Sequence, residues 1–278
     1  MNLAALLALY WGEPCRGVLA GPGLYKFYVV HVIVGMLGML AFVLALRLPI
    51  GRTSVQGDPA PDSEVSKASR WRQFQQGMWE VVSNQAIVIA SSVEAAMYLG
   101  VGALMGFLPL YAKNIAQLSD ASVGVLIWVP LVMAMVGKPL AGRISDHLGR
   151  KPVILAGLML CIAMLPLIPL TTQIIGLVIE GALFGLGMAI VTPSTTALVT
   201  DLCKAGNYGA ALGVFGTIWD IGEASGPILA GALIFAVGSL ERPAAYLLAF
   251  SIVAVVMVAV GLLFGLTVHD PEVTTQKA

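Results

Sequence analysis

The stretch AAYLLAFSIVAVVMVAVGLLFGLT, residues 244–267, contains no charged side chain. A helix needs about 20 mostly apolar residues to cross the roughly 30 Å hydrocarbon layer of a bilayer, so this stretch predicts a membrane-spanning helix. Similar stretches precede it along the chain, at residues 26–48, 87–111, 121–141, 152–171, 174–199 and 208–237. The sequence therefore predicts an all-α membrane protein with several spans.

Composition indicates the same class. Hydrophobic residues make up 58% of the chain, charged residues 11%, and the mean hydropathy is +0.91, far from the balance of soluble globular domains. The three cysteines form no CxxC pair and no metal-binding spacing. The sequence also shows no nucleophile–base pair, no metal cluster and no phosphate-binding loop. We therefore expect neither an enzyme nor a bound cofactor or metal.

The spans and the polar stretches between them divide the chain into five parts. We expect a remnant of a preceding helix at 1–22, a transmembrane helix at 23–49, a cytoplasmic linker at 50–85, a six-helix transmembrane bundle at 86–267 and a cytoplasmic tail at 268–278. Within the linker, Trp71, Phe74, Met78 and Val82 recur at helical spacing and predict an amphipathic helix. That helix either lies on the membrane surface or packs under the bundle, and the sequence favours neither.

The distribution of basic residues predicts the orientation in the membrane. If the linker is cytoplasmic, eleven Lys and Arg residues fall inside: Arg47, Arg52, Lys67, Arg70, Arg72, Lys138, Arg143, Arg150, Lys151, Lys204 and Lys277. Four fall outside: Arg16, Lys26, Lys113 and Arg242. Because cytoplasmic loops carry the excess of Lys and Arg, we expect the long loop and the C-terminus to be cytoplasmic. The location expected is a cell (inner) membrane.

A charged segment between the third and fourth spans has a specific pattern, GRISDHLGRK at residues 142–151. Its glycines, Gly142 and Gly149, would allow a tight corner between two helices. Asp146 could accept hydrogen bonds at a helix N-terminus, where the helix dipole favours an anion. Arg150 and Lys151 would hold the corner on the cytoplasmic side. The basic residues alone fit any cytoplasmic loop, but the acid and the glycines at these spacings do not.

This segment resembles the G-x-L-x-D-x-x-G-R-[RK] loop of the major facilitator superfamily, which joins helices two and three and recurs in weaker form between helices eight and nine. This segment departs from the family's pattern at Ile144, where leucine is usual, at His147, where arginine is common, and at Val153, which occupies the last basic position. These departures fit the second copy of the loop better than the first. The resemblance implies a twelve-helix fold of two six-helix halves around a central cavity. This chain then corresponds to helices six to twelve, the C-terminal half, resembling drug/proton antiporter-type members. It implies that Gly142, Asp146, Gly149, Arg150 and Lys151 form a conformational-switch loop.

A second segment, GEASGPILAG at residues 222–231, is similar to the GP-containing stretch of the family's helices five and eleven. Gly222 and Gly226 form a small-xxx-small pair, which lets two transmembrane backbones approach closely. Pro227 removes one backbone donor and can bend its helix. With Gly231, these residues are expected to form a helix-packing motif, although ordinary helix packing would account for the glycines alone.

Acidic residues inside apolar spans are the best functional candidates, because a charge at the bilayer centre costs roughly 2.5–3.5 kcal/mol on insertion scales. Glu94, with Tyr98 one turn further on, could line a cavity in the first of the six spans. Glu180 lies close to the start of its span and could simply extend to the interface. Each acid has the alternative role of a hydrogen-bonded group that fixes helix packing.

Asp220 and Glu223 lie three residues apart and therefore near one another on one helix. Asp220 is about 16 Å into its span at 1.5 Å per residue, near the midplane, which fits a proton-coupling group. Seven-residue steps align the two acids with Gly213 and Gly216. We therefore expect both acids to point at the bundle rather than at lipid.

The resemblance and the acids together predict secondary active transport of a small molecule by alternating access. We expect proton-coupled efflux of drug-like or amphipathic compounds. Two alternatives remain open: proton symport for uptake of a polar metabolite, and a truncated or split half-transporter that is inactive without an N-terminal half. The expected partners are the lipid bilayer, a small-molecule substrate and the proton, with a separate N-terminal half added under the half-transporter alternative, but no nucleic acid.

Overall fold

The computed structural model describes residues 78–79, 81–203, 208–237 and 240–268, together with Met36 and Met39, which are helical. The chain divides into two units, Met1–Asp62 and Ser63–Ala278, and every helix below belongs to the second. The predicted remnant at 1–22 and most of the predicted helix at 23–49, the linker and the tail lie outside the described residues.

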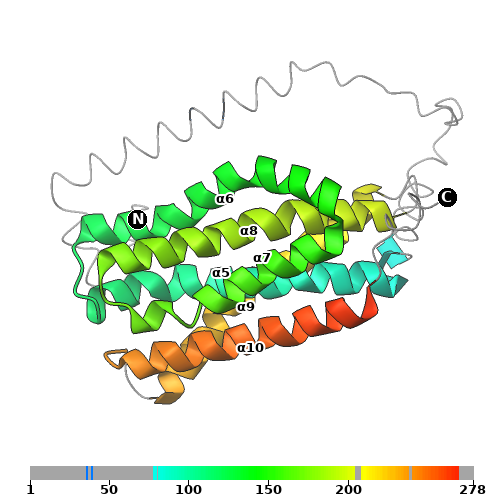
Figure 1. Ribbon diagram of the computed structural model, residues 1–278. Helices are drawn as coiled ribbons and strands as arrows, with labels where there is room; N and C mark the ends of the chain where they lie inside the picture. Colours follow the sequence, from blue (N-terminus) through cyan, green and yellow to red (C-terminus); the bar gives the residue numbers. More distant parts are fainter. Residues whose placement is uncertain are drawn as a thin grey trace, which may run out of the picture. The chain divides into compact units, whose positions relative to one another are not determined.

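The described part of the second unit is helical throughout, with no strand (Figure 1). Its helices are α5 (Gln85–Asn114), α6 (Asp120–Leu148), α7 (Arg150–Met164), α8 (Ile174–Leu202), α9 (Tyr208–Val237) and α10 (Pro243–Thr267), with a short 3-10 turn, η1 (Ile168–Leu170). Within the described residues, six spans are long and apolar enough to cross a membrane, with α7 and η1 counted as one. The predicted fold class, an all-α membrane bundle, is confirmed.

Local sequence explains where several helices begin and end. The Asn84 side chain accepts a hydrogen bond from the backbone N–H of Ala86 at 3.1 Å, and Ser119 caps α6 through the N–H of Ser122 at 3.3 Å. Such caps satisfy backbone donors that have no partner within the helix. Gly149 has φ 91° and is the single residue between α6 and α7. Only glycine adopts this conformation without strain, so α6 and α7 turn sharply there.

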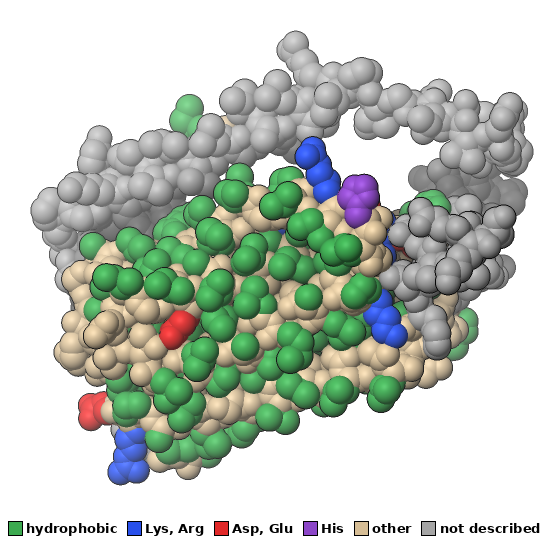
Figure 2. Space-filling model, viewed as in Figure 1, with side chains coloured by type: hydrophobic (Ala, Val, Ile, Leu, Met, Phe, Trp, Pro, Cys, Tyr) green, Lys and Arg blue, Asp and Glu red, His purple; other side chains and the backbone are tan. Residues whose placement is uncertain are grey.

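Helix α5 is the most enclosed span, and α6 and α9 are the least enclosed. Helix α5 packs against α9, α10 and α8, while α8 also packs against α6 and α7. Figure 2 shows hydrophobic side chains over most of the visible face of the described helices, with Lys, Arg and His at the end where α6 meets α7. An apolar girdle between polar ends is the surface that a bilayer requires.

Close backbone contacts hold particular helices together. A side-chain Cβ at Gly222 of α9 would lie 2.8 Å from the Cα of Ala95 on α5, and one at Gly226 would lie 2.7 Å from the backbone N of Ala103. On the other side of the bundle, a Cβ at Gly185 of α8 would lie 2.7 Å from the Cα of Pro130 on α6. These distances are shorter than real contacts allow, so the absence of a side chain lets the backbones touch.

Candidate functional site

The Glu94 side chain is almost completely enclosed, with 1% of its surface exposed, near the middle of the bundle. Its Oε2 atom accepts a hydrogen bond from the Thr195 hydroxyl of α8 at 2.5 Å. The same hydroxyl lies 2.9 Å from the Val191 carbonyl oxygen. A hydroxyl has one proton to donate, so Thr195 can donate either to the carboxylate or to its own helix. The bond to Glu94 joins two helices across 101 residues of sequence.

Polar and aromatic groups surround this carboxyl. The Tyr98 ring lies against the Trp219 ring of α9, with centroids 4.4 Å apart and planes tilted by 48°. The Thr192 Oγ1 atom is buried close to both Glu94 and Tyr98, although it has no partner of ordinary hydrogen-bond geometry within the described residues. Lys138 of α6 is close enough for its charge to act on Glu94. Helices α5, α6, α8 and α9 therefore all contribute to one polar region in an apolar bundle.

The side chains of Asp220 and Glu223 lie outside the packed face of α9. Both side chains are exposed on α9, and an added methyl at Gly213 would touch nothing within 4 Å. The packed face of α9 is instead set by Gly222, Gly226 and Ala230. Asp220 is two residues from Gly222, or about 200° around the helix, so it lies on the side of α9 opposite to this packed face. Both acids therefore lie on a face of α9 that the other described helices leave uncovered, and the prediction that they point at the bundle rather than at lipid stays a prediction; their charges reach the Tyr98 hydroxyl.

Glu180 lies toward the other end of α8. Its Oε1 atom accepts a hydrogen bond from the Thr171 hydroxyl at 2.5 Å, and its Oε2 atom is buried without a hydrogen-bond partner in the described part of the chain. The Thr171 carbonyl in turn accepts the Tyr111 hydroxyl at 3.0 Å, as does the Pro169 carbonyl at 3.0 Å. Glu180 is thus part of a polar join between α5 and the turn before α8, well separated along the helices from Glu94.

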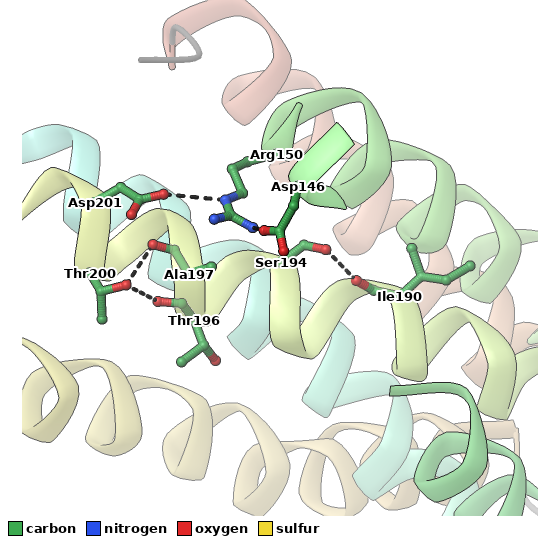
Figure 3. Close-up of polar contacts among 8 residues, drawn as sticks. All are labelled: Asp146, Arg150, Ile190, Ser194, Thr196, Ala197, Thr200 and Asp201. Atoms are coloured by element: carbon green, nitrogen blue, oxygen red, sulfur yellow. Dashed lines mark hydrogen bonds and ion pairs between the residues drawn. The ribbon is translucent and has the colours of Figure 1, made fainter. Parts of the chain in front are cut away.

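The segment 142–151 forms an ion-pair cluster at the α6–α7 corner (Figure 3). Arg150 pairs with Asp146 one turn earlier, and its Nε atom lies 3.2 Å from Asp201 Oδ2 at the end of α8. Asp146 lies in the last turn of α6, so its predicted place at a helix N-terminus was wrong, and Arg150 stabilises it there. Gly149 makes the corner, whereas Gly142 lies within α6.

Hydroxyl side chains are frequent along α8, and most of them bond to their own helix. In Figure 3, the Ser194 hydroxyl donates to the Ile190 carbonyl at 2.8 Å, and the Thr200 hydroxyl lies 2.7 Å from the Ala197 carbonyl. Such bonds satisfy the hydroxyl within the helix. Thr195 differs because it also reaches a carboxylate on another helix. Sequence reasoning missed Thr195 and Asp201, and the run of Ser and Thr at 192–200 was the available signal.

The arrangement of side chains in the described residues does not provide a metal-binding site. Within them, no group of three or more His, Cys, Asp or Glu side chains could hold a metal ion. What the enclosed carboxyl of Glu94 can do is exchange a proton and change the strength of its bond to Thr195.

Comparison with known proteins gives concordant results. Residues 90–278 match the family model described as Major Facilitator Superfamily. Multidrug resistance protein 2 of Bacillus subtilis is 28% identical over 149 residues, which cover 52% of this chain and 37% of that protein. Quinolone resistance protein NorA of Staphylococcus aureus is 26% identical over 179 residues, which cover 64% of this chain and 44% of that protein.

The fold also resembles a solved structure, that of a bacterial homologue of the human lysosomal transporter Spinster in an inward-facing, unoccupied conformation. The TM-score is 0.56 at 19% identity, covering 67% of this chain and 43% of that one. At this identity the likeness concerns the fold alone. The chain spans less than half the length of each of these three proteins.

Proposed function

The chain belongs to the major facilitator superfamily and is a multi-pass integral membrane protein, and from this premise we propose that it supplies the C-terminal half of a proton-coupled exporter of drug-like or amphipathic compounds. The mechanism proposed is alternating access, in which two halves rock about a site near the bilayer midplane. In the proposed orientation, the α6–α7 corner faces the cytoplasm, because basic residues concentrate there.

The observation that carries the proposal is the enclosure of Glu94. An ionised carboxylate in a membrane interior is costly and is usually retained for function. Glu94 accepts a hydrogen bond from the Thr195 hydroxyl, the Thr192 hydroxyl lies close by, and the charge of Lys138 is near enough to act on it. This setting supports a group that gains and loses a proton during the transport cycle. It favours Glu94 over Asp220, which is exposed, as the coupling acid.

The aromatic pair beside Glu94 supports the proposed substrate class. Tyr98, one turn from Glu94, contacts Trp219, and both side chains are partly exposed; aromatic surfaces bind flat or apolar compounds without strict geometry. Two relatives bear the names multidrug resistance protein and quinolone resistance protein. Together these features favour an amphipathic substrate over a small polar metabolite.

The ion-pair cluster of Asp146, Arg150 and Asp201 is proposed as the conformational switch. It ties the α6–α7 corner to the end of α8. Ion pairs at a helix end can be broken and remade at small cost, because exposed pairs contribute about 0–1 kcal/mol each. The cluster can therefore hold one state without preventing the exchange between states.

The test uses the full-length protein in proteoliposomes with an imposed pH gradient and a fluorescent quinolone as the transported probe. Wild-type protein should accumulate the quinolone against its gradient. The Glu94→Gln variant should lose this accumulation but keep exchange of labelled for unlabelled quinolone. Glu241→Gln is the matched control, because Glu241 is an exposed residue in the turn before α10, and it should behave as wild type.

The other outcomes separate the alternatives. Accumulation by Glu94→Gln at the wild-type level would exclude Glu94 as the coupling acid. Proton movement driven by polar metabolites in the direction of uptake, with no response to the quinolone, would support a symporter instead. The absence of any gradient-driven movement, restored by adding a separate N-terminal half, would identify a half-transporter.

A further inference from the structure

Five of the six helices fall into two groups, each held together by backbone contact, while α10 packs against members of both. In the first group, α5 and α9 touch at Gly222 and Gly226. In the second, α8 touches α6 at Gly185, and a Cβ at Gly187 of α8 would lie 2.8 Å from the Gly157 carbonyl oxygen of α7. Relieving such a contact requires a shift of whole helices, since no side chain can rotate away. Each group is therefore expected to move as a unit.

The boundary between these groups, which we call the α5–α8 seam, is held by side chains instead. Gly100 of α5 faces the Phe184 ring of α8, whose Cζ would lie 3.7 Å from an added Cβ, an ordinary contact. Two polar joins cross the seam: Glu94 to Thr195 near the middle, and Tyr111 to the turn before α8. Contacts of this kind can slide or part at lower cost than touching backbones.

Building on the proposed function, we propose that Thr195 is a positioning residue that latches Glu94 across the α5–α8 seam, and that proton uptake by Glu94 releases this latch. With Glu94 ionised, the Thr195 hydroxyl donates to an anion, and such charge-assisted bonds are roughly twice as strong as neutral ones. When a proton from water adds to a Glu94 oxygen, the acceptor becomes neutral. The Thr195 proton can then turn to the Val191 carbonyl at 2.9 Å.

The charged and titratable groups that act on Glu94, directly or through Tyr98, come from several helices. Helix α5 contributes Tyr98, α6 contributes Lys138 and α7 contributes Cys161; α9 contributes Asp220 and Glu223, which act on Tyr98. The described residues of α10 include one tyrosine, which lies at the far end beside Tyr111. Among these groups only Glu94 bonds to the opposite side of the seam, so its protonation state is the one that changes the latch.

The experiment measures distances between spin labels in the full-length protein at acidic and at mildly alkaline pH, after replacing the native cysteines by alanine. Labels at Leu212 of α9 and Leu140 of α6 report across the seam. Labels at Leu212 and Gln85 report within the first group, and labels at Leu140 and Met159 within the second. All four positions are exposed. Acidification should raise the population of the longer distance between Leu212 and Leu140 about fivefold. The distances within each of the two groups should stay fixed.

Three variants test the latch itself. Glu94→Gln should show the acidic seam distribution at both pH values, because its amide carries no charge. Thr195→Val should lose most of the pH-dependent change, and Thr195→Ser should restore it. A merely structural threonine would alter stability without altering this pH profile.

The latch is overturned if Thr195→Val keeps the full pH response, or if distances within the two groups change as much as the seam distance. If Glu94→Gln abolishes proton-driven accumulation of the quinolone but leaves the seam distances as in wild type, the latch fails and the proposed function stands. If Glu94→Gln alters neither accumulation nor the seam, both fail.

Discussion

A methyl group added at Gly222 has no space to occupy between α5 and α9. The Cβ of an alanine there would lie 2.8 Å from the Cα of Ala95, whereas ordinary van der Waals contact begins at 3.4 Å. The Ala95 carbonyl oxygen would lie closer still, and the opposing atoms belong to the backbone, so the helices would have to separate by more than about 0.6 Å, the difference between these two distances. Overpacking of this kind typically costs about 1–3 kcal/mol. We expect the Gly222→Ala variant to lose that much free energy of unfolding.

The measurement is equilibrium unfolding of the purified protein in mixed micelles with increasing SDS, followed by circular dichroism. Gly213→Ala is the matched control on the same helix, because its added methyl would touch nothing within 4 Å. Alanine is favoured over glycine in a helix by about 1 kcal/mol, so the control should be as stable as wild type or more stable. Equal stability of Gly222→Ala and Gly213→Ala would refute the close approach of α5 and α9.

Two further predictions use the same unfolding measurement. Arg150→Ala should lower the free energy of unfolding by about 1 kcal/mol more than Arg143→Ala, because Arg150 pairs with two carboxylates; equal losses would contradict a stabilising cluster. Tyr111→Phe should cost about 1–2 kcal/mol, because two carbonyls lose their donor. Tyr208→Phe, at an exposed position on α9, should cost less, and a similar cost for both would argue against the Tyr111 bonds.

The spans were predictable because the thickness of the bilayer fixes the length of an apolar helix. The predicted span 208–237 coincides with α9, and the predicted 244–267 begins one residue inside α10. The extension of α6 to Leu148 was not foreseen. Its last turn is polar, so hydropathy ends the span earlier than the helix does. The segment 142–151 was therefore predicted to lie between two spans, whereas its first part, up to Leu148, continues α6.

The candidate site was predictable only in part. An acid in an apolar span is visible in the sequence, so Glu94 could be named. Its partner Thr195 could not, because threonine is common in membrane helices and its role depends on a contact 101 residues away. The packed face of α9 could not be read from the sequence, because glycine spacing indicates possible packing faces and not which one is used. In α9 the face with Gly222 and Gly226 makes the contact.

The Tyr111 hydroxyl bonds to two main-chain carbonyls, at 3.0 Å each. Amide carbonyls do not titrate, and an ordinary phenol loses its proton only near pH 10, so this join keeps its strength from acid to neutral conditions. Glu94 lies 17 positions earlier on α5, about 26 Å along the helix at 1.5 Å per residue. In the proposed latch, α5 is thus joined to the turn before α8 near one end and responds to protons about a third of the way from the other end. If the first group tilts across the α5–α8 seam, we expect the displacement to be smaller near Tyr111 than near Gln85.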